Sequence, residues 1–222
     1  MKQIMIEKDI LKNNNEIAKR NKIIFDDKKI FTINLLGSPG AGKTSILEKI
    51  ICNIKKEFKM TVIEGDLYTA KDAKRIESHG IDVIQVNTGG GCHLDASMIE
   101  KSLNHIDMKE LDFLVIENIG NLVCPASYYL SEDMKIVVMS VTEGNDKPLK
   151  YPSIFQKSSV VILNKMDMIE LTDFDMKEFY KDIYCLNKDI KVFEVSCRKN
   201  KGVNELSEFF IGKIKNKKDS FK

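Results

Sequence analysis

The residues with the clearest chemical meaning are eight near the start of the chain, Gly37-Ser-Pro-Gly-Ala-Gly-Lys-Thr44, which match G-x-x-x-x-G-K-[ST] at every fixed position. An apolar run precedes them and a helix-like run follows, which is the strand–loop–helix setting that a phosphate-binding loop needs. This setting disfavours a chance match. Backbone N–H groups and the helix dipole would attract phosphates there. The nucleotide contacts expected from this segment are Gly37, Ser38, Gly40, Ala41, Gly42, Lys43, Thr44 and Ser45.

A second motif bears on the choice of base. Asn164-Lys165-Met166-Asp167 follows the apolar run 160–163 and has the form N-K-x-D. The Asp167 carboxylate can accept hydrogen bonds from N1–H and the 2-amino group of guanine, a donor pair that adenine lacks. The alternative is that Asp167 caps a helix. The expected base contacts are Asn164, Lys165 and Asp167.

A further base loop is expected at Ser196-Cys197-Arg198, after the apolar run 192–195. It is similar to the Ser-Ala-Lys loop of GTPases, with cysteine in place of alanine. The backbone N–H near Cys197 would then meet guanine O6, with Ser196 beside it. An ordinary strand-to-helix turn is the alternative.

Two carboxylates follow apolar runs and would lie near the phosphates. Asp66 ends residues 62–66, and Glu117 ends residues 113–117 and is followed by Gly120. Ligands of doubly wound sheets bind at the carboxyl ends of the strands. We expect Thr44, Asp66 and Glu117 to hold Mg²⁺ directly or through water.

The catalytic residues expected from this arrangement are Lys43, Asp66 and Glu117. Gly120 would sense the γ-phosphate through its backbone N–H. Either acid could instead cap a helix, and the residues do not decide which acid orients the attacking water.

A third group has the chemistry of metal ligands. Cys92 and His93 follow a run of three glycines, and Cys124 follows the strand-end segment 118–123. Thiolate and imidazole suit Zn²⁺ or Ni²⁺, and two chains could complete a four-coordinate site. The alternative is a structural Cys-His pair with Cys124 in the core. We expect Cys52 and Cys185 in the core and His79 and His105 at the surface.

Alternating elements must position these groups. Apolar runs predict strands, and amphipathic segments between them predict helices, so the strands should be parallel with right-handed crossovers. The fold class expected is α/β: a three-layer P-loop NTPase fold with a mostly parallel central sheet of about seven strands flanked by helices. The predicted strands are 30–36, 60–64, 82–86, 113–117, 136–141, 160–163 and 192–195, and the predicted helices are 43–57, 69–78, 95–104, 174–185 and 203–215.

Residues 4–25 predict a further polar helix, and the Asn13-Asn14-Asn15 run predicts a weak point in it. We expect residues 1–29 to form an amino-terminal helical arm and residues 30–222 to form the P-loop GTPase domain.

Composition limits the class of protein. The chain has 222 residues, with 35 basic and 33 acidic side chains and a net charge of +2. This near balance argues against nucleic-acid binding, and we expect the basic tail, residues 213–222, to be a solvated helix end. No apolar run approaches the ~20 residues that span a bilayer, and residues 1–12 lack a signal-type stretch. We therefore expect a cytoplasmic protein with reduced thiols and no membrane partner.

Four segments together resemble one family. They are Glu64-Gly-Asp66, residues 87–96 (NTGGGCHLDA), residues 116–126 (IENIGNLVCPA) and residues 141–148 (VTEGNDKP). They look like the hydrogenase nickel-incorporation GTPases, the HypB family of SIMIBI-class P-loop GTPases. The resemblance spans about residues 31–210.

This resemblance implies a slow GTPase that binds nickel, or zinc, and helps insert nickel into [NiFe] hydrogenase. It implies GTP/GDP and Mg²⁺ as ligands and a GTP-promoted homodimer that shares metal through Cys92, His93 and Cys124. It also implies an accessory nickel-transfer protein and the hydrogenase large subunit as partners. Some members carry Cys-x-x-Cys-Gly-Cys or a histidine-rich run near the amino terminus, whereas residues 1–30 here contain neither Cys nor His.

Two alternatives stay open. The chain could be a urease-type nickel-insertion GTPase, which shares the fold and chemistry, although the Glu-Asn-Ile-Gly-Asn and Cys-His-Leu-Asp-Ala segments favour the hydrogenase branch. It could instead be a nickel-binding module that the nucleotide only stabilises, which the lack of a histidine-rich tract disfavours.

Overall fold

One parallel sheet forms the middle layer of the molecule. The computed structural model describes residues 6–66 and 69–220, and within them seven strands hydrogen-bond in the order β3-β2-β4-β1-β5-β6-β7. Every named pair is parallel. The strands are β1 Phe31–Gly37, β2 Met60–Asp66, β3 Asp82–Asn87, β4 Phe113–Glu117, β5 Met134–Ser140, β6 Val160–Asn164 and β7 Lys191–Glu194.

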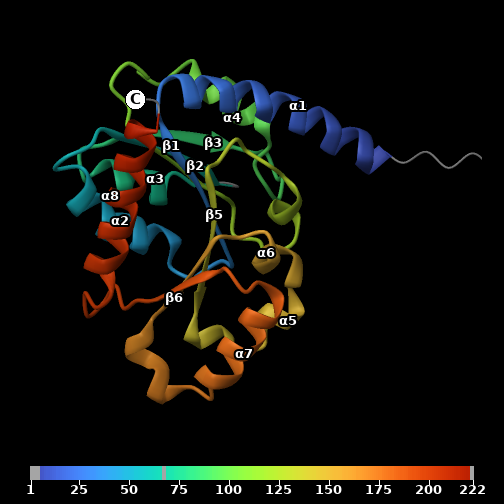
Figure 1. The fold of residues 1–222 in the computed structure, drawn as a ribbon, viewed down its shortest axis with the longest axis vertical. Coiled ribbons are helices and arrows are strands. Elements are labelled where there is room, and N and C mark those ends of the chain that lie inside the picture. Colours follow the sequence, from blue (N-terminus) through green and yellow to red (C-terminus); the bar gives the residue numbers. More distant parts are fainter. Residues whose placement is uncertain (1–5, 67–68, 221–222) are drawn as a thin grey trace, which may run out of the picture.

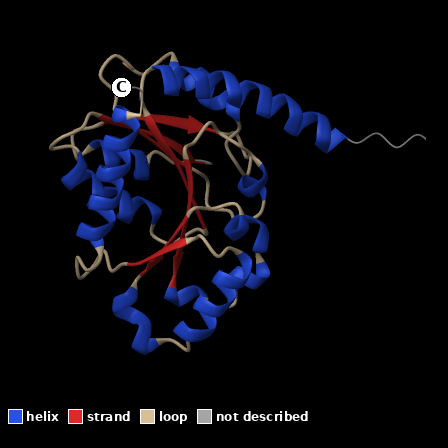
Figure 2. Ribbon diagram, viewed as in Figure 1, coloured by secondary structure: helices blue, strands red, loops and turns tan. Residues whose placement is uncertain are grey.

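Helices cover both faces of this sheet, as Figures 1 and 2 show. Helices α2, α3 and α8 lie on one face, and α1, α4, α5, α6 and α7 lie on the other. The expected three-layer α/β fold is therefore confirmed. The helices are α1 Ile6–Asp27, α2 Lys43–Ile54, α3 Lys71–Glu77, α4 Ala96–Leu103, α5 Lys147–Lys150, α6 Pro152–Gln156, α7 Met176–Leu186 and α8 Val203–Asp219.

The central strands are buried on both faces, which explains their unbroken apolar sequences. All seven residues of β1 and all five of β4 are buried. The edge strand β3 is half exposed. Each predicted strand is present with its ends moved by at most two residues. The helices α5 and α6 were not predicted, because four or five residues are too few to show a helical repeat.

Helix α1 continues through the three asparagines, so the predicted weak point is wrong. The reason is tertiary: Asn14 is buried, its Nδ2 donates to the Tyr129 carbonyl at 2.9 Å, and its Oδ1 accepts from the Ala96 N–H at 2.8 Å. These bonds satisfy an amide that would otherwise compete with the helix backbone. Residues 4 and 5 of the predicted helix lie outside the described residues.

The second half of α1 packs on the domain, where Ala18, Asn21 and Phe25 have no exposed surface. Asn21 Nδ2 donates to the Ala96 carbonyl at 3.1 Å. The division of the chain after residue 29 stays a prediction, and this packing shows that the first helix is held at least along its second half.

Three expectations about the surface can be compared with the structure. Cys52 and Cys185 are exposed, so their placement in the core was wrong; each lies on the solvent side of an amphipathic helix. His105 is exposed, and His79 is partly exposed. In the tail, Lys217 is mostly buried against Asp26 and Asp133, so that part is not simply solvated; residues 221 and 222 lie outside the described residues.

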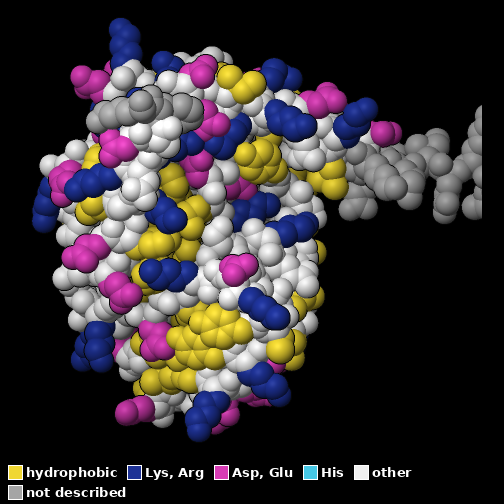
Figure 3. Space-filling view, in the orientation of Figure 1, with side chains coloured by type: hydrophobic (Ala, Val, Ile, Leu, Met, Phe, Trp, Pro, Cys, Tyr) yellow, Lys and Arg dark blue, Asp and Glu magenta, His cyan; other side chains and the backbone are white. Residues whose placement is uncertain are grey.

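No helix in the described ranges is long and apolar enough to cross a membrane. On the face shown in Figure 3, Lys and Arg side chains alternate with Asp and Glu, with no large patch of one sign. That distribution is consistent with the balanced composition.

Candidate functional site: a nucleotide cavity and a cysteine–histidine cluster

The phosphate loop joins β1 to α2 and is fixed by a residue from β6. Gly42 precedes α2 with φ of 99°, and a Cβ there would lie 2.3 Å from Asn164 Nδ2. That amide donates to the Ala41 carbonyl at 3.1 Å. Only glycine fits both the backbone angle and the space at position 42. Asn164 was expected to contact the base, and its hydrogen bond to Ala41 shows that it supports the phosphate loop.

Lys43 is a buried cation inside this loop. Only 9% of its surface is exposed, and its Nζ donates to the Gly37 and Ser38 carbonyls at 3.4 and 3.3 Å. Burial lowers its pKa. Carboxylates such as Glu117 act on this ammonium, but none forms an ion pair with it within the described residues. A buried cation without such a partner is costly, so the loop favours a ligand that brings negative charge.

Two glutamates lie side by side, Glu117 at the end of β4 and Glu64 two residues before the end of β2. The register pairs Glu64 with Glu117, and 3% and 4% of their surfaces are exposed. Glu117 Oε1 accepts from Thr44 Oγ1 at 2.9 Å. Burial raises the pKa of Glu117 to about 7 and that of Glu64 to about 8.

One carboxylate oxygen of each glutamate, Oε2, is buried and has no hydrogen-bond partner among the residues that the structure describes. With the Thr44 hydroxyl and Asp66, these groups form the oxygen-rich donor set that Mg²⁺ prefers. The residues present therefore fit a magnesium ion. Neither expected acid caps a helix, although Asp66 Oδ2 accepts from the backbone N and Oγ1 of Thr69 at 3.3 and 2.9 Å.

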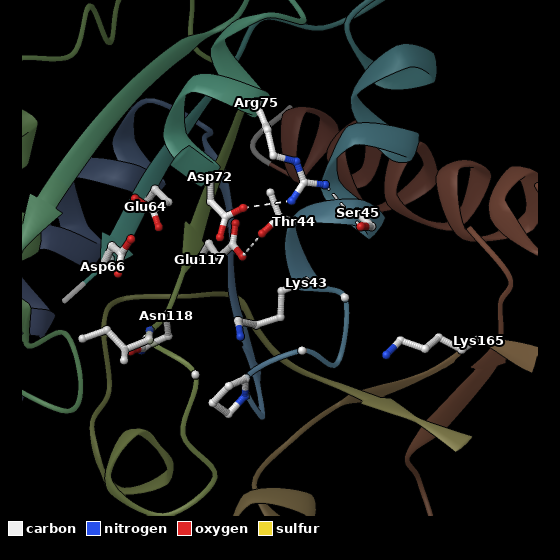
Figure 4. A pocket seen from close by; sticks show the side chains of 16 residues that line it. Lys43, Thr44, Ser45, Glu64, Asp66, Asp72, Arg75, Glu117, Asn118 and Lys165 are labelled. Carbon is white, nitrogen blue, oxygen red and sulfur yellow. Dashed lines mark hydrogen bonds and ion pairs between the residues drawn. The ribbon is translucent and has the colours of Figure 1, made fainter. Parts of the chain in front are cut away.

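A cavity of about 470 Å³ opens over these groups (Figure 4). Gly120 lies at its edge, and a Cβ there would meet Pro39 of the phosphate loop at 2.9 Å. This close approach puts the backbone after β4 against the loop. The lining residues include Gly40, Gly42, Lys43, Thr44, Ser45, Glu64, Asp66, Asp72, Arg75, Glu117, Gly120 and Lys165.

The base motif lies at a second cavity of about 390 Å³, which shares Gly42, Ser45 and Lys165 with the first and is also lined by Asp167 and Cys197. The two cavities therefore adjoin as the phosphate and base ends of a nucleotide would. This arrangement joins all three expected motifs at one edge of the sheet.

Asp167 is partly exposed and caps no helix. Its Oδ1 accepts a hydrogen bond from Ser196 Oγ, and that bond lowers its pKa. An ionised acceptor is what guanine recognition needs. Cys197 is half-buried, and burial raises the pKa of its thiol to about 11.

The cysteine–histidine cluster, defined as Cys92, His93 and Cys124, comes from two loops. One ligand atom from each residue lies within 4.8 Å of the other two. Cys92 Sγ is 3.6 Å from His93 Nδ1, and the His93 ring packs against the Tyr128 ring, tilted by 32°, with centroids 3.9 Å apart. Cys92 is exposed and Cys124 partly so, so the cluster faces solvent with three soft donors that suit Ni²⁺ or Zn²⁺.

One segment connects the two sites. It begins at Glu117 beside Thr44, passes Gly120 against the phosphate loop, and ends at Cys124. Along it, Asn121 Nδ2 donates to the Cys92 carbonyl at 3.2 Å. The same residue pairs with Gly37 of the phosphate loop through an isolated bridge.

Three charged residues on the wall of the 470 Å³ cavity were not expected from the sequence to act in the site: Glu64, Asp72 and Arg75. Glu64 had a signal, because it precedes Asp66 by two residues and a strand turns alternate side chains to the same face. Asp72 and Arg75 lie on α3, and no sequence signal pointed to them, because only the packing of α3 beside α2 brings them to the cavity.

Comparison with known proteins agrees with this site. Residues 31–194 match the model of the CobW/HypB/UreG nucleotide-binding domain. The hydrogenase maturation factor HypB of Azotobacter chroococcum is 43% identical over 204 residues, which cover 92% of this chain and 67% of that one. The chain belongs to the HypB family.

The sequence and a crystal structure of HypB from Helicobacter pylori extend the comparison. The hydrogenase/urease maturation factor HypB of Helicobacter pylori is 39% identical over 96% of this chain and 88% of its own. A crystal structure of HypB from Helicobacter pylori in complex with nickel superposes with a TM-score of 0.87 at 38% identity, over 92% of this chain and 96% of that one. The resemblance inferred from the four segments is thereby confirmed.

Proposed function

We propose that this HypB family member is a GTP-hydrolysing metallochaperone that binds nickel and helps insert it into [NiFe] hydrogenase. The observation that carries the proposal is the segment 117–124, which runs from the phosphate-end glutamate to a cluster ligand. A nucleotide-dependent change at Glu117 or Gly120 would move the backbone that holds Cys124 and Cys92. Nickel is then the ion that is transferred, and GTP hydrolysis drives the transfer.

The nucleotide contacts we assign follow the geometry of the two cavities. Phosphates would lie on the loop from Gly37 to Ser45, with Lys43 neutralising their charge and Gly120 beside them. Guanine would lie at Asp167, with Asn164, Lys165, Ser196 and Cys197 around it. Asp167→Asn should shift preference from GTP toward xanthosine triphosphate, because the amide N–H₂ would face the 2-amino group of guanine, a second donor, but can donate to the carbonyl oxygen that xanthine carries at that position; unchanged GTP affinity would refute this assignment.

Mg²⁺ would be held by Thr44, Asp66 and Glu117, and it would supply charge neutralisation at the phosphates. One of the two acids, Glu117 or Asp66, would orient the attacking water through its carboxylate, and Lys43 would stabilise the charge that develops on the phosphates. Without a glutamine assigned to the water, we expect slow intrinsic turnover. The buried, unpartnered oxygens of Glu64 and Glu117 support a cation at this position.

The cluster would bind nickel, with zinc as a competitor, through Cys92, His93 and Cys124. Three ligands that face solvent suit a site that must release its ion. We propose a GTP-promoted homodimer in which two clusters meet, because a second chain would complete the coordination. An accessory nickel-transfer protein and the hydrogenase large subunit are the partners proposed, in the cytoplasm.

One experiment tests the central claim. Nickel affinity and oligomer size are measured with GDP and with a non-hydrolysable GTP analogue, for wild type, Cys92→Ser and Cys185→Ser. We expect nickel binding and size to differ between the two nucleotides in wild type and in Cys185→Ser, but nickel binding to be weak in both states of Cys92→Ser. Equal nickel binding by Cys92→Ser and wild type would refute the metal assignment.

The alternative clients need separate tests. The name of the Helicobacter pylori relative includes urease, so a urease-type role is the second candidate, and gene deletion tells which nickel enzyme loses activity. A module that the nucleotide merely stabilises would release no phosphate from GTP, and the comparison of wild type with Lys43→Ala decides that point.

A further inference from the structure

Arg75 lies on the wall of the 470 Å³ cavity over the phosphate loop, and none of the roles proposed above uses its positive charge. It lies on α3, and its side chain is 44% exposed. Of the residues that line this cavity in the described part of the chain, Lys43, Lys165 and Arg75 are positively charged. Lys43 is already enclosed by the loop, so Arg75 is the more accessible cation on the α3 side.

The guanidinium is held at the start of α2 by a fork of hydrogen bonds. Its Nε and Nη2 donate to the two carboxylate oxygens of Glu48 at 3.1 and 2.7 Å. Nη1 donates to Asp72 Oδ1 at 2.9 Å, and Nη2 also reaches Ser45 Oγ at 3.3 Å. Figure 4 shows the side chain directed toward Ser45 and Thr44, the residues that follow Lys43 in the phosphate loop.

These partners can be exchanged for phosphate. Arginine binds carboxylate and phosphate with the same bidentate geometry, and a triphosphate carries more charge than one carboxylate. The pair with Glu48 is partly exposed, with side chains 44% and 25% accessible, so its net contribution to stability is small. The hydrogen bond from Nη2 to the hydroxyl of Ser45, in the first turn of α2, already places the guanidinium at the edge of the expected phosphate site.

We propose that Arg75 is a catalytic residue acting in cis: when GTP binds, its guanidinium leaves Glu48 and contacts the triphosphate. This inference rests on the proposed GTPase function. In that reaction water oxygen bonds to the γ-phosphorus, the bond from γ-phosphorus to the β–γ bridging oxygen breaks, and the water proton passes to the released phosphate or solvent. The negative charge that gathers on the leaving GDP oxygens is what a guanidinium stabilises.

The test uses steady-state phosphate release, GDP affinity and the affinity for GDP with aluminium fluoride, in the full chain with Mg²⁺. Arg75→Ala should lower kcat at least tenfold and weaken aluminium fluoride binding by a similar factor, with GDP affinity within threefold of wild type. Arg75→Lys should recover only part of the loss, because lysine lacks the fork. Lys74→Ala, an exposed neighbour on the same helix, is the matched control and should behave as wild type.

Glu48→Gln separates catalysis from a structural bridge between α2 and α3. It breaks the same ion pair but keeps the arginine, so kcat should stay within twofold of wild type or rise. Equal losses in Glu48→Gln and Arg75→Ala would overturn the inference, as would an Arg75→Ala kcat within twofold of wild type or an equal loss of GDP affinity. Hydrolysis that is the same in wild type and Lys43→Ala would instead refute the GTPase proposal itself, so the two failures are distinguishable.

Discussion

The nucleotide cavity and the cysteine–histidine cluster are neighbours at one edge of the sheet, but they are built in opposite ways. Lys43, Thr44 and Glu117 are each at most 9% exposed and already hydrogen-bonded within the chain. The cluster has an exposed Cys92 and ligands from two loops. A buried, prearranged site suits charge stabilisation during a reaction, whereas an open site with three ligands suits an ion that must be passed on.

The largest expected effect tests the buried side of this contrast. Lys43→Ala removes the cation enclosed by the phosphate loop and should lower GTP hydrolysis at least ~100-fold. Phosphate release at saturating GTP measures it, with the exposed Lys177→Ala as the control. Turnover within threefold of wild type would mean that the loop does not supply the decisive charge.

The open side is tested by removing ligands. Cys92→Ser and Cys124→Ser should each weaken nickel binding by about 10–100-fold or more. Mutation of residues that only hydrogen-bond to a metal ligand already lowers affinity by about 10–100-fold, so loss of a ligand itself should cost at least as much. Binding should also weaken as pH falls, because thiol and imidazole ligands must lose protons. Calorimetry with nickel measures the affinity, and Cys185→Ser should leave it unchanged. Full affinity in both cluster variants would place the metal elsewhere.

The third prediction concerns the cost in folding stability of burying the two acids in the nucleotide-free, metal-free protein. Because the pKa of Glu64 is raised to about 8, the folded state keeps its proton while the unfolded state loses it above about pH 4.5. Stability should therefore fall as pH rises from about 4.5 to about 8. Glu64→Gln stays neutral, so it should be the more stable at pH 8, by on the order of 2 kcal/mol or about 4–8 °C in Tm.

Thermal unfolding between pH 5 and pH 9 measures this difference. The exposed Glu77→Gln is the control and should follow wild type at every pH. Parallel curves for Glu64→Gln and wild type would show that burial of the acid pair carries no such cost, which would weaken the contrast between the buried cavity and the open cluster.

The smallest expected effect tests whether the two regions communicate. Asn121→Ala removes the hydrogen bond to the Cys92 carbonyl, which is worth about 1 kcal/mol. The ratio of nickel affinities with GDP and with a GTP analogue should then move toward one by up to about fivefold, while hydrolysis changes little. Titration of nickel in both nucleotide states gives the ratio; an unchanged ratio would mean that coupling does not pass through this contact.

Much of this molecule could be predicted locally. Continuous apolar runs located all seven strands, and the phosphate loop and Asp167 were recognisable because each motif lies within a few residues of the chain. Misplacements arose where solvent exposure depends on which helix face is covered, as at Cys52 and Cys185. The asparagine run misled for the same reason, since its stabilising partners, Ala96 and Tyr129, are far away in sequence.

By itself, the sequence determined the strand–loop–helix units and the residue types that could bind phosphate, guanine and a soft metal, because backbone propensity and motif spacing act over short distances. Only the tertiary structure decided which of these groups meet. The order β3-β2-β4-β1 puts Glu64 beside Glu117, and the packing of α3 beside α2 turns Arg75 toward the phosphate loop. Side chains from separate segments become neighbours only when the strands between them have paired.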